Sequence, residues 1–389
     1  MIEIHFIINS LEVGGAERHL SQVLPAIKAM GFSIKVIVLS HKATLKPIFE
    51  KAGIPVFLGP NFDCLPKIIR RPVSLVTSVL RLIFNFLGNR KVIHHPFLPE
   101  AYLLTALAAR LTFFKGTLVM SRRTVNDYQQ RRPMLSQLET LFHRFTIRAL
   151  GNSQIIVQQL CQEGFSPEKV GLIYNGIETQ PFQTSVSKQE VRKSLNFNPD
   201  ALIFIVVANL YPYKGHIDLL NAFALITNKL PKNWQLFCAG RSIDTLEHLE
   251  NHASILGLSS HVKFLGSRSD TVQLFAASDI AISCSHEEGL SNSILEAMAT
   301  GLPLVVTNVG GNAEAVQEMV TGLVVPPKNP EKMAEALLTL ALAPQLRQIY
   351  GNAGKERVYQ HFTLQQCVQK YADFYQSLAN NDQIFEQSA

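Results

Sequence analysis

Short runs rich in β-branched residues alternate with helix-length segments along almost the whole chain, and this alternation limits the possible folds more than any other feature. Strand, helix and strand at this spacing predict parallel sheets with crossover helices. The runs form two series, divided by the polar segment 178–200, which has no strand pattern. The first series is 3–8, 34–39, 92–94, 117–120, 153–157 and 170–174, and the second is 203–208, 235–239, 262–265, 279–283, 304–307 and 322–325. We therefore expect an α/β protein with two doubly wound, Rossmann-like domains.

The length supports this division, because 389 residues exceed what one hydrophobic core usually serves. We expect an N-terminal domain over residues 1–185, a second domain over 186–360, and a C-terminal helix over 361–389 that could pack back on the first domain. Ligands of such sheets bind beyond the carboxyl ends of the strands. Two such domains facing each other would therefore bind a ligand in the cleft between them.

Composition narrows the class of protein further. With 47% hydrophobic and 17% charged residues, the chain is typical of a globular protein. It has no apolar run near the ~20 residues of a membrane-spanning helix, and its first residues are too polar for a signal peptide. Five scattered cysteines without a C-x-x-C pair favour reduced thiols in a cytosolic protein. Because H-E-x-x-H and D-x-D motifs are also missing, we expect neither a metal nor a cofactor.

Two carboxylates stand eight residues apart in the run from Glu288 to Glu296. Ser291 is a favourable N-cap, residues 292–300 have a helical pattern, and Gly301 suits the end of a helix. Glu288 is then expected in a loop and Glu296 about one turn into the helix. Between them, free backbone N–H groups and the positive end of the helix dipole favour an anion. A nucleotide sugar, which has hydroxyl groups on both sides of a phosphate, would match this arrangement.

Other strand-end loops contain groups that suit a phosphate or a sugar. Gly14 and Gly15 follow the first strand, where paired glycines let the backbone approach a ligand. Lys214 follows the strand 203–208 and could neutralise a diphosphate. Further loops on the same expected edge of the second sheet contain Gly240-Arg241, Gly266-Ser267-Arg268 and Gly310-Gly311. One such loop is weak evidence, but with the Glu288 loop the second domain has five, and chance rarely produces so many.

Together these stretches resemble the retaining glycosyltransferases of family 4 (GT4), also called glycosyl transferases group 1, which have the GT-B fold. The resemblance covers nearly the whole chain and keeps the order of the family's motifs. The matching stretches are Gly14-Gly15-Ala16-Glu17-Arg18, Asn175-Gly176-Ile177 and the segments 207–216, 262–266, 288–297 and 310–314.

The resemblance implies roles for the matching residues. Glu288 would contact the donor sugar, Glu296 the ribose hydroxyls, and Lys214 the leaving diphosphate. Many members have an arginine where this chain has Asn209, so Arg241 or Arg268 would supply the missing positive charge. Further donor-binding groups would be the backbone of Gly14, Gly15, Gly289, Leu290, Ser291 and Asn292.

The acceptor side is less clearly marked. Many members use a histidine of the N-terminal domain near the reacting carbon, and His95, beside His94, is a candidate. Arg122 and Arg123 are further candidates because they follow an expected strand.

The resemblance also implies the reaction: a sugar moves from a nucleoside diphosphate sugar to a glycan or a lipid-linked acceptor, with retention of anomeric configuration and without a metal. A UDP-sugar is the expected donor, with GDP- and ADP-sugars as alternatives. Such an enzyme would act in polysaccharide or lipopolysaccharide synthesis. Two other functions stay open, a nucleotide-sugar epimerase or hydrolase, and a non-catalytic subunit of the same fold that binds a partner at the membrane.

Basic charge is concentrated between residues 65 and 150, where 14 Lys and Arg face 3 Asp and Glu. Residues 73–87 have apolar side chains on one helical side and polar ones on the other. This pattern is typical of a helix at a membrane interface, and equally of a crossover helix in a doubly wound sheet. We expect a cytoplasmic enzyme that could bind the anionic inner face of the cytoplasmic membrane as a peripheral protein. Nucleic acid is not an expected partner, because no recognised binding module is present.

Overall fold

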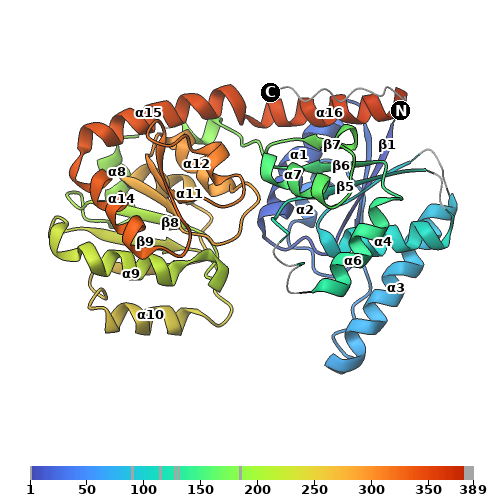
Figure 1. Cartoon of the computed structure of the whole chain (residues 1–389), viewed down its shortest axis with the longest axis horizontal. Helices are drawn as coiled ribbons and strands as arrows, with labels where there is room; N and C mark the ends of the chain where they lie inside the picture. Colours follow the sequence, from blue (N-terminus) through green and yellow to red (C-terminus); the bar gives the residue numbers. More distant parts are fainter. Residues whose placement is uncertain are drawn as a thin grey trace. The chain divides into compact units, whose positions relative to one another are not determined.

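The structure, a computed structural model, describes residues 2–88, 92–113, 116–126, 129, 132–183 and 186–380. It divides into two compact units (Figure 1). Unit 1 contains Met1–Asn175 together with Leu364–Ala389, and unit 2 contains Gly176–Thr363. The division after residue 175 precedes the expected one at 185, and the last helix belongs to unit 1.

Seven parallel strands form the sheet of unit 1, in the order β3-β2-β1-β4-β5-β6-β7. Side chains of β1 alternate between the faces, because Ile4 and Phe6 belong to one buried cluster and Ile7 belongs to another. Both faces of this sheet are therefore covered. The strands are β1 (Glu3–Ile8), β2 (Ser33–Val38), β3 (Val56–Phe57), β4 (Ile93–Pro96), β5 (Thr117–Arg122), β6 (Arg148–Gly151) and β7 (Val170–Leu172).

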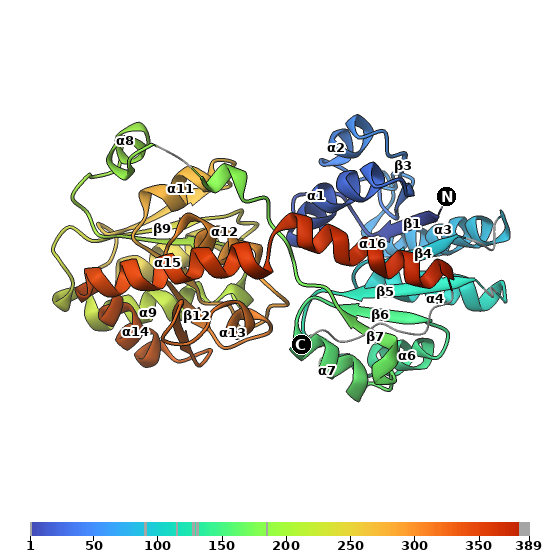
Figure 2. The ribbon, with the colours of Figure 1, turned by 90° about the horizontal axis from the view of Figure 1, so that it is seen from above.

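Helices cover the two faces of this sheet in separate groups. One face is covered by α1 (Gly15–Ala29), α2 (Lys46–Lys51) and α16 (Leu364–Asn380). The other is covered by α3 (Lys67–Gly88), α4 (Pro99–Leu111), α6 (Pro133–His143) and α7 (Gln154–Gln162). A short 3-10 helix, η1 (Pro167–Lys169), precedes β7. Figure 2 shows α16 lying beside α1 across the sheet, and the two helices are in contact.

Unit 2 is built around six parallel strands in the order β10-β9-β8-β11-β12-β13. The strands are β8 (Ile203–Val207), β9 (Gln235–Ala239), β10 (Val262–Gly266), β11 (Ile280–Ser283), β12 (Leu304–Thr307) and β13 (Gly322–Val325). One buried cluster joins this sheet to α9 (His216–Ile226), α10 (Leu246–Ile255) and α14 (Pro330–Leu342). A second contacting series is α8 (Lys188–Ser194), α11 (Thr271–Ala277), α12 (Asn292–Thr300) and α15 (Pro344–His361). The shorter elements are η2 (Gln180–Phe182), η3 (Pro212–Lys214), η4 (Thr227–Lys229) and α13 (Asn312–Ala315).

Eleven of the twelve expected strands are confirmed to within two residues at each end, and the strand expected at 153–157 is wrong. That segment begins helix α7, and the strand before it is β6. Ser153 takes the extended N-cap position of the helix, with φ −156° and ψ 156°. Ile156 and Val157 are buried while Ile155 is exposed, so the β-branched run covers one side of a helix. The two-residue strand β3 was not expected.

The amphipathic segment 73–87 belongs to α3, whose buried residues are Ser78, Leu82 and Phe86. These three positions lie on one face of the helix and pack toward α4. The first half of α3 has no buried residue and extends away from the sheet (Figure 1). Among the described helices, none is long and apolar enough to cross a membrane.

Candidate active site

In the sheet of unit 2, the strand order reverses between β8 and β11: the chain adds β9 and β10 on one side of β8, and β11, β12 and β13 on the other. β8 pairs with β9 on one side and with β11 on the other, so the loops that follow these two strands diverge. In parallel sheets this switch point is the usual place of a ligand. Backbone hydrogen bonds join three loops there: His286 N donates to Tyr213 O at 2.7 Å, and Gly311 N donates to Gly289 O.

Lys214 and Glu288 form an ion pair at this point, from the loops after β8 and β11. Ser285 Oγ donates to the same carboxylate oxygen, Glu288 Oε1, at 3.0 Å. The two side chains are 16% and 14% exposed, so a ligand can still reach them. Burial alone would lower the pKa of Lys214, but the negative charge of Glu288 outweighs burial and raises this pKa. The structure therefore places a permanent cation beside a carboxylate at the switch point.

Two glycines allow these loops to approach one another. Gly215 has φ 72°, and a Cβ atom there would lie 1.9 Å from Cys284 O. Gly310 has φ 51°, and a Cβ atom there would lie 2.1 Å from Glu288 O. Both positions thus combine a left-handed backbone with a contact that no side chain permits. The position of Glu288 consequently depends on glycine in a third loop.

Helix α12 has the expected bounds and begins directly after this loop. Ser291 is its N-cap, and Gly301 ends it with φ 83°. Leu290 is buried, so it could meet a ligand only through its backbone. Glu296 is half-buried in the second turn. The N–H groups of the first turn and a carboxylate thus lie along the start of the helix, as the sequence predicts.

Asn209 stands where the resemblance leads one to expect an arginine, and its side chain contacts Arg241. Asn209 Oδ1 accepts the backbone N–H of Arg241 at 3.1 Å, and Arg241 Nη2 donates to Tyr211 OH at 3.1 Å. The rings of Tyr211 and Tyr213 are 5.7 Å apart, and Lys214 Nζ lies 5.3 Å from the centre of the Tyr213 ring. These contacts connect Arg241 to Lys214 through two tyrosines.

Arg268 has a different surrounding, because Asp270 holds its guanidinium. Arg268 Nε donates to Asp270 Oδ1 at 2.7 Å, and Nη2 donates to Oδ2. This pair neutralises the charge of Arg268. Of the two arginines proposed to compensate for Asn209, Arg241 is therefore the better placed.

Sequence reasoning missed several residues that hold the site together. His286 Nε2 and Asp218 Oδ2 are 2.6 Å apart, and this pair joins the Glu288 loop to α9. Thr307 Oγ1 donates to Ser285 O at 2.6 Å and joins β12 to the same loop. These partners are distant in the sequence and belong to no motif, so no local signal could have found them. Ser285 alone had a weak signal, as a polar residue just after a strand.

In unit 1, Gly14 and Gly15 lie where the sequence predicts, between β1 and α1. Gly14 is the N-cap of α1, and Gly15 is its first residue. The carboxylate of Glu17 folds back over Gly14, and burial raises the pKa of this carboxyl group. These residues belong to unit 1 and the Lys214 site to unit 2, so each is described within its own unit.

Two of the three acceptor-side candidates are not available to a ligand. Arg122 is completely buried and forms ion pairs with Glu139 and Glu163, which also are buried or nearly so. His95 is likewise fully buried, with Nδ1 2.7 Å from Tyr375 OH and Nε2 2.8 Å from Ser121 Oγ. Burial lowers the pKa of His95 to about 3, so the ring is neutral and structural. Of the three candidates, Arg123 is half-buried directly after β5, so part of its side chain is accessible to an acceptor.

Within the described ranges, one group of side chains has the composition of a metal site. Ligand atoms of Glu139, His143 and Glu163 lie within 4.8 Å of one another. The guanidinium of Arg122, however, donates to both carboxylates. This cation holds the place that a metal ion would need, and we interpret the group as an internal ion network.

Two family models match consecutive parts of this chain. The model described as Glycosyltransferase Family 4 matches residues 13–181, and the model described as Glycosyl transferases group 1 matches residues 187–357. The chain belongs to these glycosyltransferases.

Individual relatives agree with this family. An uncharacterized glycosyltransferase of Methanocaldococcus jannaschii is 31% identical over 229 residues, which cover 57% of this chain and 58% of the relative. An Escherichia coli UDP-Gal:alpha-D-GlcNAc-diphosphoundecaprenol alpha-1,3-galactosyltransferase is 25% identical over 345 residues, covering 83% of this chain and 88% of the relative. Among solved structures, Anabaena HepE in complex with UDP-glucose has a TM-score of 0.84 at 23% identity, covering 97% of this chain and 100% of HepE. This likeness, with two Rossmann-like units, confirms the GT-B fold.

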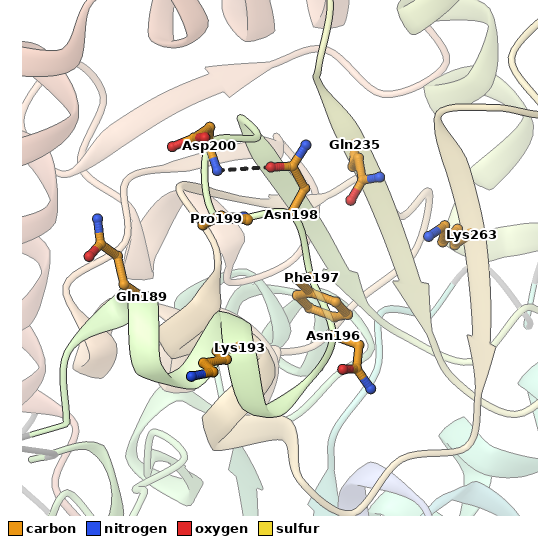
Figure 3. Close-up of a pocket in the computed structure, with 9 residues that line it drawn as sticks. All are labelled: Gln189, Lys193, Asn196, Phe197, Asn198, Pro199, Asp200, Gln235 and Lys263. Carbon is orange, nitrogen blue, oxygen red and sulfur yellow. Dashed lines mark hydrogen bonds between the residues drawn. The ribbon is translucent and has the colours of Figure 1, made fainter.

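The glycosyltransferase also has a cavity of about 860 Å³ in unit 2, shown in Figure 3. It lies at the amino ends of the strands, where Gln235 begins β9 and Lys263 is near the start of β10. The sticks in Figure 3 also show Asn198 Oδ1 accepting the backbone N–H of Asp200, at 3.0 Å. Lys214 and Glu288 follow the carboxyl ends of their strands, so the cavity is separate from the candidate active site.

Proposed function

We propose that this glycosyltransferase transfers a sugar from a UDP-sugar to a glycan or a lipid-linked acceptor, with retention of anomeric configuration and without a metal. The observation that carries the proposal is the ion pair of Lys214 and Glu288 at the switch point of unit 2. GDP- and ADP-sugars are alternative donors. We propose a UDP-sugar as the first choice of donor because HepE was solved with UDP-glucose and the E. coli relative is named for UDP-Gal.

The pair would separate when the donor binds. The diphosphate would replace Glu288 as the partner of Lys214, and the N–H groups at the start of α12 would bind its oxygens. Glu288 would then accept hydrogen bonds from hydroxyls of the donor sugar, and Glu296 from those of the ribose. Because the positive charge of Lys214 is in place before the reaction, it would stabilise the negative charge that develops on the leaving diphosphate.

The transfer itself exchanges one carbon–oxygen bond for another. The bond from the anomeric carbon to the diphosphate breaks, and the acceptor hydroxyl forms the new bond on the same face. The proton of that hydroxyl passes to an oxygen of the departing diphosphate. Lys214 and Arg241 would supply the positive charge in the absence of a metal.

Titration calorimetry with UDP-, GDP- and ADP-sugars, in the presence of EDTA, tests the donor site. We expect one nucleotide class to bind to the wild type and to lose at least about tenfold in affinity in Glu296→Ala, because the ribose hydroxyls lose their acceptor. Binding that requires Mg²⁺ would contradict metal independence. Failure of all three classes to bind would favour a non-catalytic subunit, while release of free sugar without an acceptor would favour a hydrolase.

We further propose that the enzyme binds the membrane as a peripheral protein, through α3. The buried face of α3 contains Ser78, Leu82 and Phe86, and the opposite face is also apolar but exposed. Phe84 and Leu87 are 73% and 69% exposed. The exposed stripe consists of Ile69, Val76, Leu80, Phe84 and Leu87.

Neighbouring parts of unit 1 extend this apolar surface and add positive charge. Three exposed residues of α6, which lies on the same side of the sheet as α3 (Figure 1), are Met134, Leu138 and Leu141. Exposed cations of the same region are Lys67, Arg71, Arg110, Arg132 and Arg144. In the described part of 65–150, the acids are Glu139, which is buried against Arg122, and Glu100. An anionic bilayer surface fits this combination of apolar and basic side chains.

Flotation with vesicles tests the membrane proposal. We expect the full chain to bind vesicles of phosphatidylcholine and phosphatidylglycerol at low salt and not vesicles of phosphatidylcholine alone. The double variant Leu80→Gln/Phe84→Gln should lose at least about tenfold in binding, because each side chain contributes about 1.5–3 kcal/mol of apolar burial. Ile255→Gln, an equally exposed apolar residue of unit 2, is the control. Equal binding by the double variant and the control would refute α3 as the contact.

A further inference from the structure

Arg123 follows β5 in unit 1, and uncharged groups surround its guanidinium. Nη2 donates to Asn175 Oδ1, and Nη1 lies 3.5 Å from Tyr371 OH. The central carbon lies 5.8 Å from the centre of the Phe97 ring. These three partners come from β4, β7 and α16 or the residues next to them, so the guanidinium is held firmly by elements of one unit.

Arg123 has no direct ion-pair partner. In the described part of the chain, no carboxylate oxygen lies within 4 Å of it, whereas its neighbour Arg122 has two carboxylates. The charge of Arg123 nevertheless acts on nearby groups: it helps to lower the pKa of His19 and His95, and it opposes the rise that burial causes in the pKa of Glu17. A half-buried cation without a direct carboxylate partner is stabilised when a ligand supplies negative charge.

Unused hydrogen-bonding atoms lie next to this guanidinium. Asn152 Nδ2 donates to the same Asn175 oxygen at 3.2 Å, while its own Oδ1 has no partner among the described residues. His19 contacts Tyr371 through Nε2, and its Nδ1 is also without a described partner. Both side chains are almost completely buried. Buried polar atoms nearly always have partners in folded proteins, so these two atoms leave hydrogen-bonding capacity that a bound molecule could use.

We propose that Arg123 recognises a phosphate on the acceptor. This inference rests on the proposed transferase function and deepens it, because it gives the acceptor a charge. A phosphate oxygen suits the free directions of a guanidinium, and neighbouring hydroxyls of the acceptor suit Asn152 Oδ1. The phosphate belongs either to a lipid-linked diphosphate sugar or to a soluble sugar phosphate.

Calorimetric titration of the full chain tests the phosphate site. The probes are N-acetylglucosamine 1-phosphate, neutral N-acetylglucosamine, and N-acetylglucosamine linked through a diphosphate to a short isoprenyl chain. We expect the charged probes to bind at least about tenfold tighter than the neutral sugar. If only the isoprenyl probe shows this preference, the acceptor is lipid-linked, and if both charged probes show it, a soluble sugar phosphate suffices.

Substitutions test whether Arg123 causes the preference for charged over neutral probes. Arg123→Gln should abolish it, and Arg123→Lys, which keeps the charge, should retain part of it. Lys51→Gln removes an exposed cation of the same unit, outside the proposed membrane surface, as a control and should leave the preference unchanged. A purely structural Arg123 would lower the melting temperature in both Arg123 variants without altering the ratio of charged to neutral binding. That result, or no preference in the wild type, would overturn the proposal.

The Lys214→Gln variant separates this site from the donor site. Phosphate preference at Arg123 should survive Lys214→Gln, while UDP-sugar binding should not. If UDP-sugars fail to bind even to the wild type and the Arg123-dependent preference persists, the transferase proposal falls and the phosphate site stands. If the preference disappears in Lys214→Gln alone, the charged probes bind at the donor site and the inference is refuted.

Discussion

Arginines at strand ends of this protein differ mainly in what neutralises them. Arg122 is buried between two glutamates, and Arg268 is paired with Asp270. Arg241 donates to a tyrosine hydroxyl and Arg123 to an asparagine oxygen. An arginine that already has a carboxylate partner gains less from a phosphate, because that partner must first be displaced. Arg122 and Arg268 are therefore not the arginines that we expect to bind ligands.

The two arginines near Asn209 give a matched test at the donor site. Arg241→Gln should weaken UDP-sugar binding by about tenfold or more, since a charge-assisted hydrogen bond to the diphosphate is lost. Arg268→Gln should change it by less than about twofold, because Asp270 already neutralises that side chain. Calorimetric titration of both variants measures this difference. A larger loss in Arg268→Gln would mean that the Asp270 pair opens when the donor binds.

The buried ion network of unit 1 should make stability depend on acid pH. Burial opposes ionisation of Glu163, but hydrogen bonds from His143 and Arg122 outweigh it and lower its pKa to about 2. The folded pKa is below the unfolded value of 4.5, so this stabilisation is present above about pH 4.5 and is lost as the pH falls toward 2. Chemical denaturation of the wild type between pH 7 and pH 3 should show that loss.

Glu163→Gln should reduce unfolding free energy by about 3 kcal/mol near pH 7, because Arg122 loses one of its two buried partners. Its stability should then fall less steeply below pH 4.5 than that of the wild type. Glu50→Gln, at an exposed carboxylate of α2, serves as the control and should keep the wild-type slope. If the free energy of unfolding fell equally steeply with pH in Glu163→Gln and in the wild type, another carboxylate would be the main cause of the acid dependence.

Residues of the proposed donor site could be predicted where chemistry and position are both local in the sequence. Glu288 and Lys214 follow strands and were expected at one edge of the sheet, which the structure shows. His95 follows a strand equally well, yet it is buried, because its partner Tyr375 lies 280 residues away. Strand-end position alone does not distinguish a ligand-binding residue from one covered by a distant helix.

Among the elements, the loop after β12 positions the loop after β11. Gly310→Ala should disturb Glu288, because its Cβ atom would lie 2.1 Å from the Glu288 carbonyl oxygen in addition to the unfavourable φ of 51°. We expect UDP-sugar affinity to fall by at least about tenfold if the carboxylate shifts by an ångström or so. Titration calorimetry measures the change.

Gly266→Ala controls for backbone strain. Gly266 has φ 66° but no atom within 4 Å of a Cβ atom, so alanine there costs only about 1–2 kcal/mol of stability. Donor affinity should then stay within about twofold of the wild type. Equal loss of affinity in the two variants would show that general destabilisation, rather than displacement of Glu288, is responsible.

Element prediction from the sequence succeeded where caps and periodicity agreed, as in α12, whose bounds and terminal glycine were expected. It failed at 153–157, where β-branched residues favour a strand but Ser153 begins a helix. For α3 the pattern predicted either a buried or an exposed apolar face. The structure shows both, because the helix is apolar on two opposite sides.

At the scale of the whole molecule, unit 1 is completed by a helix from the far end of the chain. Tyr371, Phe374 and Tyr375 of α16 are buried in its core. Ending the chain after residue 363 should therefore unfold unit 1, since each of these side chains contributes on the order of 2 kcal/mol. Unit 2 should be unaffected by this truncation, because none of its residues is removed.

Fluorescence can follow unit 2 alone. The chain has one tryptophan, Trp234, which is buried in unit 2 and stacked on Phe223 and His261. In the truncated protein, the thermal transition followed by Trp234 fluorescence should stay within a few degrees of that of the wild type. Amide hydrogens of β1 and β4 in unit 1 should exchange rapidly. Loss of the tryptophan transition as well would show that the units do not fold independently.

Two domains could be predicted from the length and from the break in strand pattern, and the helix after 361 was expected to return to the first. The position of the division was less predictable. The polar segment 178–200 separates the two strand series, but the chain enters unit 2 already at Gly176. Polarity marks where strands are missing, whereas packing decides to which unit a loop belongs.

The division of unit 1 between the two ends of the chain has a consequence during synthesis. About 190 residues separate Asn175 from Leu364, and at roughly 5–20 residues per second a ribosome needs about 10–40 s to translate them. Throughout that time the side of the sheet that α16 will cover is exposed on the nascent protein. Newly made chains are therefore expected to depend on chaperones at this surface.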